Sequence, residues 1–136
     1  MKKVFMFTCL AAIFFGCCSQ KSAKQNFDLY GKPLTLTELD GKSVTFDDEN
    51  RTATITFNKE ESRVNGNLGC NRFFGSFEIN DNSLKFSKLG ATKMMCINSM
   101  EIEAGFSAAL NATDSYEIKG GALILKNGKK VLAVLK

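Results

Sequence analysis

The sequence contains no histidine and no tryptophan, and it has a single proline among its 136 residues. Without histidine, the chain lacks the commonest general base of enzymes and the commonest metal ligand. It also has no Ser-x-x-Lys motif, in which a lysine replaces that base, and no glycine-rich phosphate-binding loop. These absences exclude the familiar patterns of nucleophilic catalysis. We expect a protein that is not an enzyme, with no cofactor and no metal.

The charge balance argues against a nucleic-acid partner. The formal net charge is +4, and Lys2 and Lys3 belong to a segment that we expect to be removed. The mature part is therefore closer to neutral, whereas a nucleic-acid-binding face needs clustered basic residues. The length fits one domain, and we expect that domain to be a monomer.

Residues 1–16 have the pattern of a signal peptide. Lys2 and Lys3 form a charged start, and the apolar run Val4–Phe15 is too short to span a bilayer as a permanent helix. Gly16 then precedes Cys17, and Phe14-Phe15-Gly16-Cys17 resembles a bacterial lipobox, where cleavage leaves a lipidated cysteine as the first residue. We therefore expect the lipid on Cys17. The alternative is an ordinary secretory signal with incidental cysteines.

Residues 17–30 are interpreted as a lipidated, flexible tether. The segment Ser19–Asn26 is polar, lacks aromatic residues and shows no periodicity, which is typical of a linker. Cys18 is a spare thiol beside the anchor, or an alternative lipidation site for which Cys17 is a poor preceding residue. No acidic cluster follows Cys17, and in some bacteria such a cluster resembles a surface-export signal. We therefore expect an outer-membrane anchor facing the periplasm, with the membrane as one partner.

The stretch 64–96 has the clearest pattern in the chain. Apolar and polar residues alternate over 72–79, a period of two that indicates a half-buried strand. A polar turn cluster at 80–83 then leads into a second alternating run at 84–87. Strand, turn and strand together predict an antiparallel hairpin.

Cys70 and Cys96 are the two cysteines in the body of the chain, because the other three lie at the amino terminus. In an oxidising compartment, a disulfide between them is the expected state. It would close a loop of about 27 residues, for which the chain-entropy model gives roughly 3.5 kcal/mol. The alternative is two buried free thiols, which behave as small hydrophobes.

Two separated motifs give this stretch a family resemblance. Residues 69–75 read G-C-N-R-F-F-G, and residues 91–96 read A-T-K-M-M-C. They match the G-C-N-x-x-x-G and T-x-M-x-C motifs of the META domain, also called the HslJ-like family, which the chain resembles from about Gly31 to its end. The family usually opens with a W-x-L strand, and Leu34-Thr35-Leu36 occupies that place here. The matching motif residues are Gly69, Cys70, Asn71, Gly75, Thr92, Met94 and Cys96.

The remaining pattern predicts about eight strands and one helix. Further strands are expected at 34–39, 44–46, 52–58, 63–68, 116–119, 122–126 and 130–135. A helix is expected from Asn98, with Glu101 completing a capping-box-like pair. Residues 31–136 are therefore predicted to form a mainly β (α+β) domain. The strands are expected to be predominantly antiparallel, and the resemblance implies a strongly bent antiparallel sheet or partial β-barrel with one packed helix.

Three methionines, Met94, Met95 and Met100, lie near the two cysteines in the sequence, and such soft sulfur ligands suit copper(I). We interpret these methionines instead as core residues beside a disulfide, because a bridged cysteine offers no thiolate. Arg72 and Phe74 lie on the strand face opposite the core. They are a candidate partner surface.

These observations predict a lipoprotein of the bacterial cell envelope that is not an enzyme. The resemblance implies an association with stress response and the outer membrane, and it leaves the biochemical role undefined. We expect protein binding or support of envelope integrity, with another envelope protein as the partner. The alternative is a periplasmic inhibitor, or a binder of a small apolar ligand on the concave side of the sheet.

Overall fold

The structure, a computed structural model, describes residues 27–48 and 50–136. The expected signal peptide, the lipidated Cys17 and tether residues 18–26 lie outside the described residues. Residues 27–30, which the sequence analysis assigned to the tether, pack against the sheet. Leu29 is only 6% exposed, and Tyr30 forms a parallel bridge with Phe57. The packed part of the chain therefore begins before the expected boundary at residue 31.

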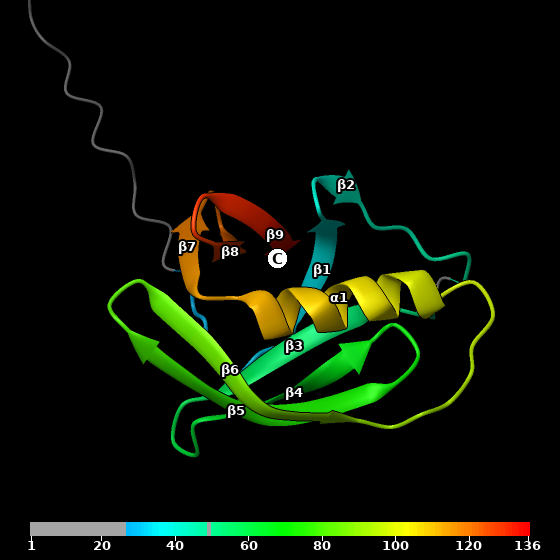
Figure 1. Ribbon diagram of the computed structural model, residues 1–136, viewed down its shortest axis with the longest axis horizontal. Helices are drawn as coiled ribbons and strands as arrows, with labels where there is room; N and C mark the ends of the chain where they lie inside the picture. Colours follow the sequence, from blue (N-terminus) through cyan, green and yellow to red (C-terminus); the bar gives the residue numbers. More distant parts are fainter. Residues whose placement is uncertain (1–26, 49) are drawn as a thin grey trace, which may run out of the picture.

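Nine strands and one helix form within the described residues (Figure 1). The elements are β1 (Leu34–Leu39), β2 (Lys42–Ser43), β3 (Ala53–Asn58), β4 (Arg63–Leu68), β5 (Arg72–Asn80), β6 (Ser83–Ala91), α1 (Met100–Ala112), β7 (Ser115–Lys119), β8 (Ala122–Asn127) and β9 (Lys130–Leu135). Neighbouring strands pair in the order β2-β1-β3-β4-β5-β6-β7-β8-β9, and β1 also pairs with β9. The sheet therefore closes in a ring, which confirms the expected strongly bent antiparallel sheet with one packed helix.

The core lies inside this ring because the strands alternate between an inner and an outer face. In β3, Ala53, Ile55 and Phe57 are fully buried, and the residues between them are half-buried. In β5, Phe73 and Phe77 face inward in the same way. Burying one such aliphatic or aromatic side chain contributes about 1.5–3 kcal/mol, so the inner face supplies the main driving force for folding.

Helix α1 packs across the ring against β1, β4, β6, β8 and β9, and it buries Phe106, Ala109 and Leu110. A Cβ atom on Gly105 would lie 2.7 Å from Cδ2 of Leu39. Glycine therefore permits the close approach of helix and sheet. None of the described residues forms a helix long and apolar enough to cross a membrane.

The predicted cap of this helix is wrong by one residue. The N-cap is Ser99, whose carbonyl oxygen accepts a hydrogen bond from the backbone N–H of Glu103 at 3.0 Å. Asn98 precedes it with a left-handed φ of 73°, and no side-chain cap bond forms. The capping box predicted for Asn98 and Glu101 is therefore absent from this helix.

The predicted strand at residues 44–46 is also wrong, because β2 ends at Ser43. Beyond it, the backbone N–H of Val44 still donates to the carbonyl of Thr37 at 2.9 Å. The chain then leaves the sheet, and Phe46 packs over Gly69. A Cβ atom on Gly69 would lie 3.0 Å from Cε1 of Phe46.

The pairing of β5 with β6 shifts register beside Gly75. A Cβ atom there would lie 2.7 Å from Cδ2 of Leu89, so glycine makes room for the shift. On β6, Lys88 takes a left-handed φ of 52°. The extra residue reverses the alternation: Leu84 and Leu89 pack on the core side, whereas Lys88 is exposed. A bulge of this kind bends the strand and re-aims a side chain.

Candidate functional site

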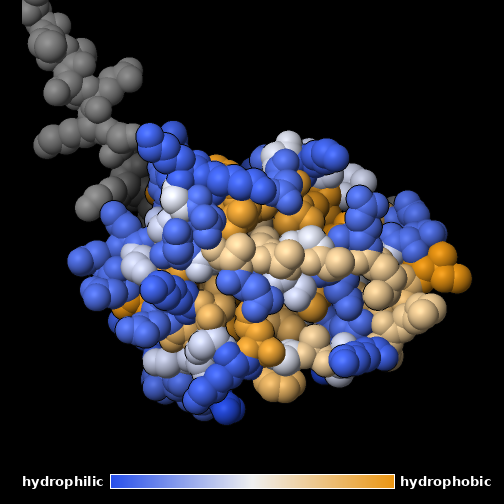
Figure 2. Space-filling view, in the orientation of Figure 1, coloured by the Kyte–Doolittle hydropathy of each residue, from blue (hydrophilic) through white to orange (hydrophobic). Residues whose placement is uncertain are grey.

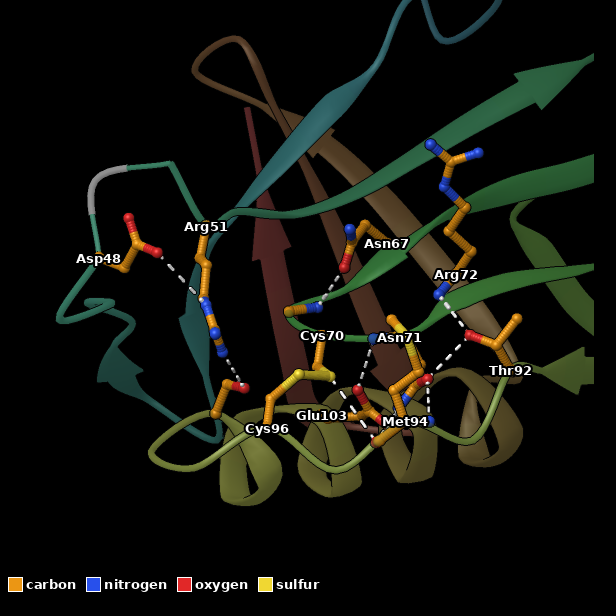
Figure 3. Close-up of a disulfide and its surroundings, with 12 residues drawn as sticks. Asp48, Arg51, Asn67, Cys70, Asn71, Arg72, Thr92, Met94, Cys96 and Glu103 are labelled. Atoms are coloured by element: carbon orange, nitrogen blue, oxygen red, sulfur yellow. Dashed lines mark hydrogen bonds and ion pairs between the residues drawn. A yellow bond between two sulfur atoms is a disulfide. The ribbon is translucent and has the colours of Figure 1, made fainter.

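The two family-like motifs meet at one end of the ring (Figure 3). Residues 69–71 connect β4 to β5, and residues 92–99 connect β6 to α1. A disulfide joins Cys70 to Cys96 across these connections, with the two Cα atoms 6.0 Å apart. We call residues 69–71 and 92–99 the bridged corner. Of the two alternatives for these cysteines, the structure contains the bridge.

The centre of the bridged corner is the side chain of Asn71, which is 1% exposed. Its Oδ1 accepts hydrogen bonds from the Thr92 hydroxyl at 2.8 Å and from the backbone N–H of Met94 at 2.7 Å. Its Nδ2 donates to the Met94 carbonyl at 2.9 Å and to Oε1 of Glu103 at 2.7 Å. All four hydrogen-bonding positions of the amide are therefore used.

Glu103 of α1 connects the helix to this network. Its Oε2 accepts a second bond, from the backbone N–H of Asn71 at 2.8 Å. Glu103 lies in the first turn of α1, where the helix dipole favours a carboxylate. Its contact with Asn71, 32 residues away, was not predicted. A carboxylate that accepts two such bonds holds the helix start against the β4–β5 connection.

Gly69 and Thr92 of the motifs fix the backbone conformation of the bridged corner. Gly69 has a φ of +122°, which disfavours any residue with a side chain. Thr92 accepts a bond from the Arg72 backbone N–H at 3.2 Å, while its own N–H donates to the Arg72 carbonyl at 3.0 Å. Gly75 lies outside the bridged corner, at the bulge described above. The motif residues therefore have structural roles in this fold.

The methionines are not core residues, and this part of the sequence interpretation is wrong. Met95 is 89% exposed and Ile97 is 83% exposed, while Met94 and Met100 are 59% and 43% exposed. We call residues 94–100 the apolar loop. Figure 2 shows apolar surface at the end of the molecule where Figure 1 places the β6–α1 connection. The side chains face solvent because the chain has left the sheet.

The backbone of the apolar loop is nevertheless fixed at several points. Both backbone polar groups of Met94 bind Asn71, and Cys96 is covalently attached to Cys70. At the far end, Arg51 donates from its guanidinium to the Ser99 hydroxyl at 3.2 Å. The apolar loop is therefore fixed to the β4–β5 connection through Met94 and Cys96, and to Arg51 through Ser99.

Charged residues border this loop on one side. Arg51 lies 3.5 Å from the Asp48 carboxylate. The backbone N–H of Asn50 and the nearby Arg51 hold the pKa of Asp48 below its ordinary value. Asp48 therefore stays ionised at neutral pH, and a polar pair stands beside the exposed apolar side chains.

Arg72 and Phe74 lie on the outer face of β5, and both are exposed, with Phe74 at 63%. In Figure 3 the Arg72 side chain points away from the bridge. The structure therefore places this predicted partner surface apart from the apolar loop. The sequence offered one signal for the apolar loop: two consecutive methionines, Met94 and Met95, lie beyond the alternating run that ends at residue 87.

The described residues hold no group of three or more His, Cys, Asp or Glu side chains that could bind a metal ion. Cys70 and Cys96 are bonded to each other, so neither provides a thiolate for a soft metal. Residues 27–48 and 50–136 also contain no buried side-chain nitrogen or oxygen without a hydrogen-bond partner. The bridged corner thus presents apolar surface, and no unsatisfied reactive group.

Comparison with known proteins supports the resemblance in fold and motif. One solved structure, an NMR structure of a protein, is 26% identical with a TM-score of 0.61, and the match covers 78% of this chain and 89% of that one. An NMR structure of a protein from Burkholderia xenovorans is 20% identical with a TM-score of 0.62, over 100% of this chain and 97% of that one. A search of curated proteins found no match. The family model of the META domain matches residues 27–136. The chain belongs to the META domain family.

Proposed function

We propose that this META domain protein is a lipoprotein of the bacterial cell envelope that is not an enzyme and that binds another protein through the apolar loop. The proposed anchor is Cys17, after removal of residues 1–16, and the proposed membrane is the outer membrane, with the domain in the periplasm. Support for the anchor comes from the charged start, the short apolar run and the Gly16-Cys17 pair.

The proposal rests on the solvent exposure of the apolar side chains in the apolar loop. Solvent exposure of four large apolar side chains on seven residues is unfavourable for a free domain. Methionine is common at protein-binding surfaces because its thioether and flexible chain adapt to a partner. Since the bridge and Asn71 already order the backbone, less entropy is lost when a partner binds.

The residues around the apolar loop favour a protein as its binding partner. Exposed Lys93 and Glu101 and the Asp48–Arg51 pair border the apolar side chains, and an apolar centre with a polar rim is typical of protein interfaces. In Figure 1 the described chain begins on the left and the apolar loop lies on the right. A domain tethered through its amino terminus can therefore direct this loop away from its own membrane.

Site-specific photocrosslinking tests this function. A benzoylphenylalanine at position 95 is expected to give one discrete protein adduct in intact cells, whereas position 129, exposed in the β8–β9 turn, gives none. The adducted protein is then purified and titrated with the wild-type protein and with the Met95→Ser/Ile97→Ser variant. Because these side chains supply the apolar centre, the variant is expected to bind about tenfold or more weakly. Equal affinity of the two proteins, or equal crosslinking at positions 95 and 129, contradicts the proposal.

Intact mass spectrometry of the same membrane-extracted protein tests the anchor. The proposal requires a mass that starts at Cys17 and includes diacylglycerol and acyl chains. A soluble species without lipid contradicts the lipoprotein assignment and leaves the apolar loop to be tested separately.

The second candidate, a binder of a small apolar ligand, has one feature in its favour. A cavity of about 80 Å³ lies between α1 and β6, lined by Leu68, Phe73, Leu89 and Leu110 among others. Ligand sites for typical small molecules have volumes of about 300–1,000 Å³. The inner face of the sheet is otherwise filled by side chains, so the protein-binding function is favoured.

A further inference from the structure

A second surface feature lies on the outer face of the sheet, away from the bridged corner. It is a hollow of about 310 Å³ over β4, β5 and the bulge of β6. Side chains of several strands and turns line it: Asn58, Glu61, Arg63, Asn65, Phe74, Ser76 and Lys88. The size falls within the range of small-molecule sites, unlike the cavity beneath α1.

The register of the sheet explains why these side chains meet. Arg63 stands opposite Ser76, and Asn65 stands opposite Phe74, in the pairing of β4 with β5. Cross-strand partners lie side by side on one face of a sheet. The bulge then turns Lys88 to this outer face, although simple alternation would place it on the core side with Leu84. A left-handed conformation is unfavourable for lysine, and here it brings a second cation into the hollow.

Within the described part of the chain, neither cation of the hollow has a salt-bridge partner. The salt bridges of residues 27–48 and 50–136 are Arg51–Asp48, Lys126–Glu117 and Lys130–Asp40. Neither Arg63 nor Lys88 takes part in one, and Glu61 is the one carboxylate that lines the hollow. With two cations and one carboxylate, the lining carries a formal net charge of +1, which favours an anion. Arginine in particular binds phosphate and carboxylate with paired hydrogen bonds.

The rest of the lining suits a ligand with an apolar face and several hydroxyl groups. Phe74 is 63% exposed, and the end of its ring covers Gly90, whose Cβ position lies 3.0 Å from Cζ. The ring therefore lies against the sheet and still presents apolar surface to the hollow. Asn58 and Asn65 supply amides that both donate and accept hydrogen bonds. An aromatic ring can pack against the C–H groups of a sugar, and side-chain amides can form hydrogen bonds with its hydroxyl groups. The lining of the hollow therefore matches a sugar.

We propose that this hollow binds an anionic saccharide, a sugar that carries a phosphate or a carboxylate. Arg63 and Lys88 bind the anionic group, Phe74 packs against the sugar ring, and the asparagine amides bind hydroxyls. This assignment is independent of the proposed partner of the apolar loop.

Chemical-shift titration of the purified protein tests the assignment. The probes are glucose 1-phosphate, glucuronate, glucose and inorganic phosphate. One or both anionic sugars are expected to shift the amide signals of Arg63, Asn65 and Ser76 saturably, and to bind about tenfold or more tightly than glucose or phosphate alone. Whichever anionic sugar binds more tightly identifies the anionic group.

Three variants localise the effect. Phe74→Ala and Arg63→Gln are each expected to weaken binding of the preferred sugar about tenfold. The first variant removes the apolar contact with the sugar ring, and the second removes a cation that binds the anionic group. Lys119→Gln, an equal loss of charge at an exposed end of β7, is expected to leave the affinity within about twofold. The proposal is overturned if phosphate alone binds as well as the sugars, if Lys119→Gln has the same effect as Arg63→Gln, or if a glutamate hexapeptide binds more tightly than either sugar.

Discussion

Replacing Asn71 with alanine is expected to lower the free energy of unfolding by about 3–5 kcal/mol, one of the largest losses for a single polar residue. The change deletes four side-chain hydrogen bonds at a position that is 1% exposed. It leaves both backbone polar groups of Met94 and one oxygen of Glu103 without their partner. Urea denaturation followed by circular dichroism measures the loss.

A matched control separates burial from residue type. Asn82 is exposed in the β5–β6 turn, and its replacement by alanine is expected to change stability by no more than about 0.5 kcal/mol. Asn71→Asp preserves the shape but puts a carboxylate beside Glu103. We expect that variant to be unstable at neutral pH and to regain stability as the pH falls and the new carboxyl group is protonated. Equal stability of Asn71→Ala and Asn82→Ala would show that the network is not structural.

Removal of the disulfide is expected to have a similarly large effect. The double variant Cys70→Ser/Cys96→Ser should lose about 3.5 kcal/mol, because the bridge closes a loop of about 27 residues in the unfolded chain. For a domain of this size, the corresponding fall in Tm is about 10 °C or more. Thermal unfolding of the oxidised wild type, the reduced wild type and the double variant measures this effect.

Reduction of the wild type is the internal control for this prediction. The reduced protein and the double variant should melt at nearly the same temperature, since both lack the same crosslink. An oxidised protein that melts at the temperature of the double variant argues against a stabilising bridge between Cys70 and Cys96.

Local pattern was sufficient to predict the sheet. The alternation that places Phe73 and Phe77 inward holds in the structure, and the Asn127–Gly128 turn joins β8 and β9 as a hairpin. The bend of the sheet and the packing of the helix against it were implied by the family resemblance. Side-chain periodicity determines the strands and their inward faces, and it is visible in a single sequence.

The bridged corner was less predictable, because its contacts join residues distant in the sequence. The sequence marks Asn71 only as a motif residue, and its buried hydrogen bonds are made with Thr92 and Glu103, 21 and 32 residues away. From the sequence, the methionines are interpreted as core residues beside a disulfide, because bridged cysteines leave no thiolate for a metal site. Hydropathy does not reveal that the chain leaves the sheet after β6 and that Met95 is held in solvent.

The position of Lys88 at the bulge likewise depends on packing that the local sequence pattern does not reveal. The predicted alternation ends at residue 87, so the pattern assigned Lys88 to neither face, and the fit of Leu89 against Gly75 determines its position. A one-residue shift moves every later side chain to the opposite face. Only the packing between β5 and β6 reveals that this lysine joins Arg63 on the outer face.

The account rests on an apolar loop that is exposed and yet fixed in one conformation. Measurement of ¹⁵N relaxation in the oxidised protein tests this most directly. The contacts predict backbone order parameters of about 0.85 at Met95 and Ile97, equal to those of the neighbouring strands, with a fall on reduction of the bridge. Order parameters below about 0.6 at these residues, with the bridge intact, would contradict a preformed binding surface.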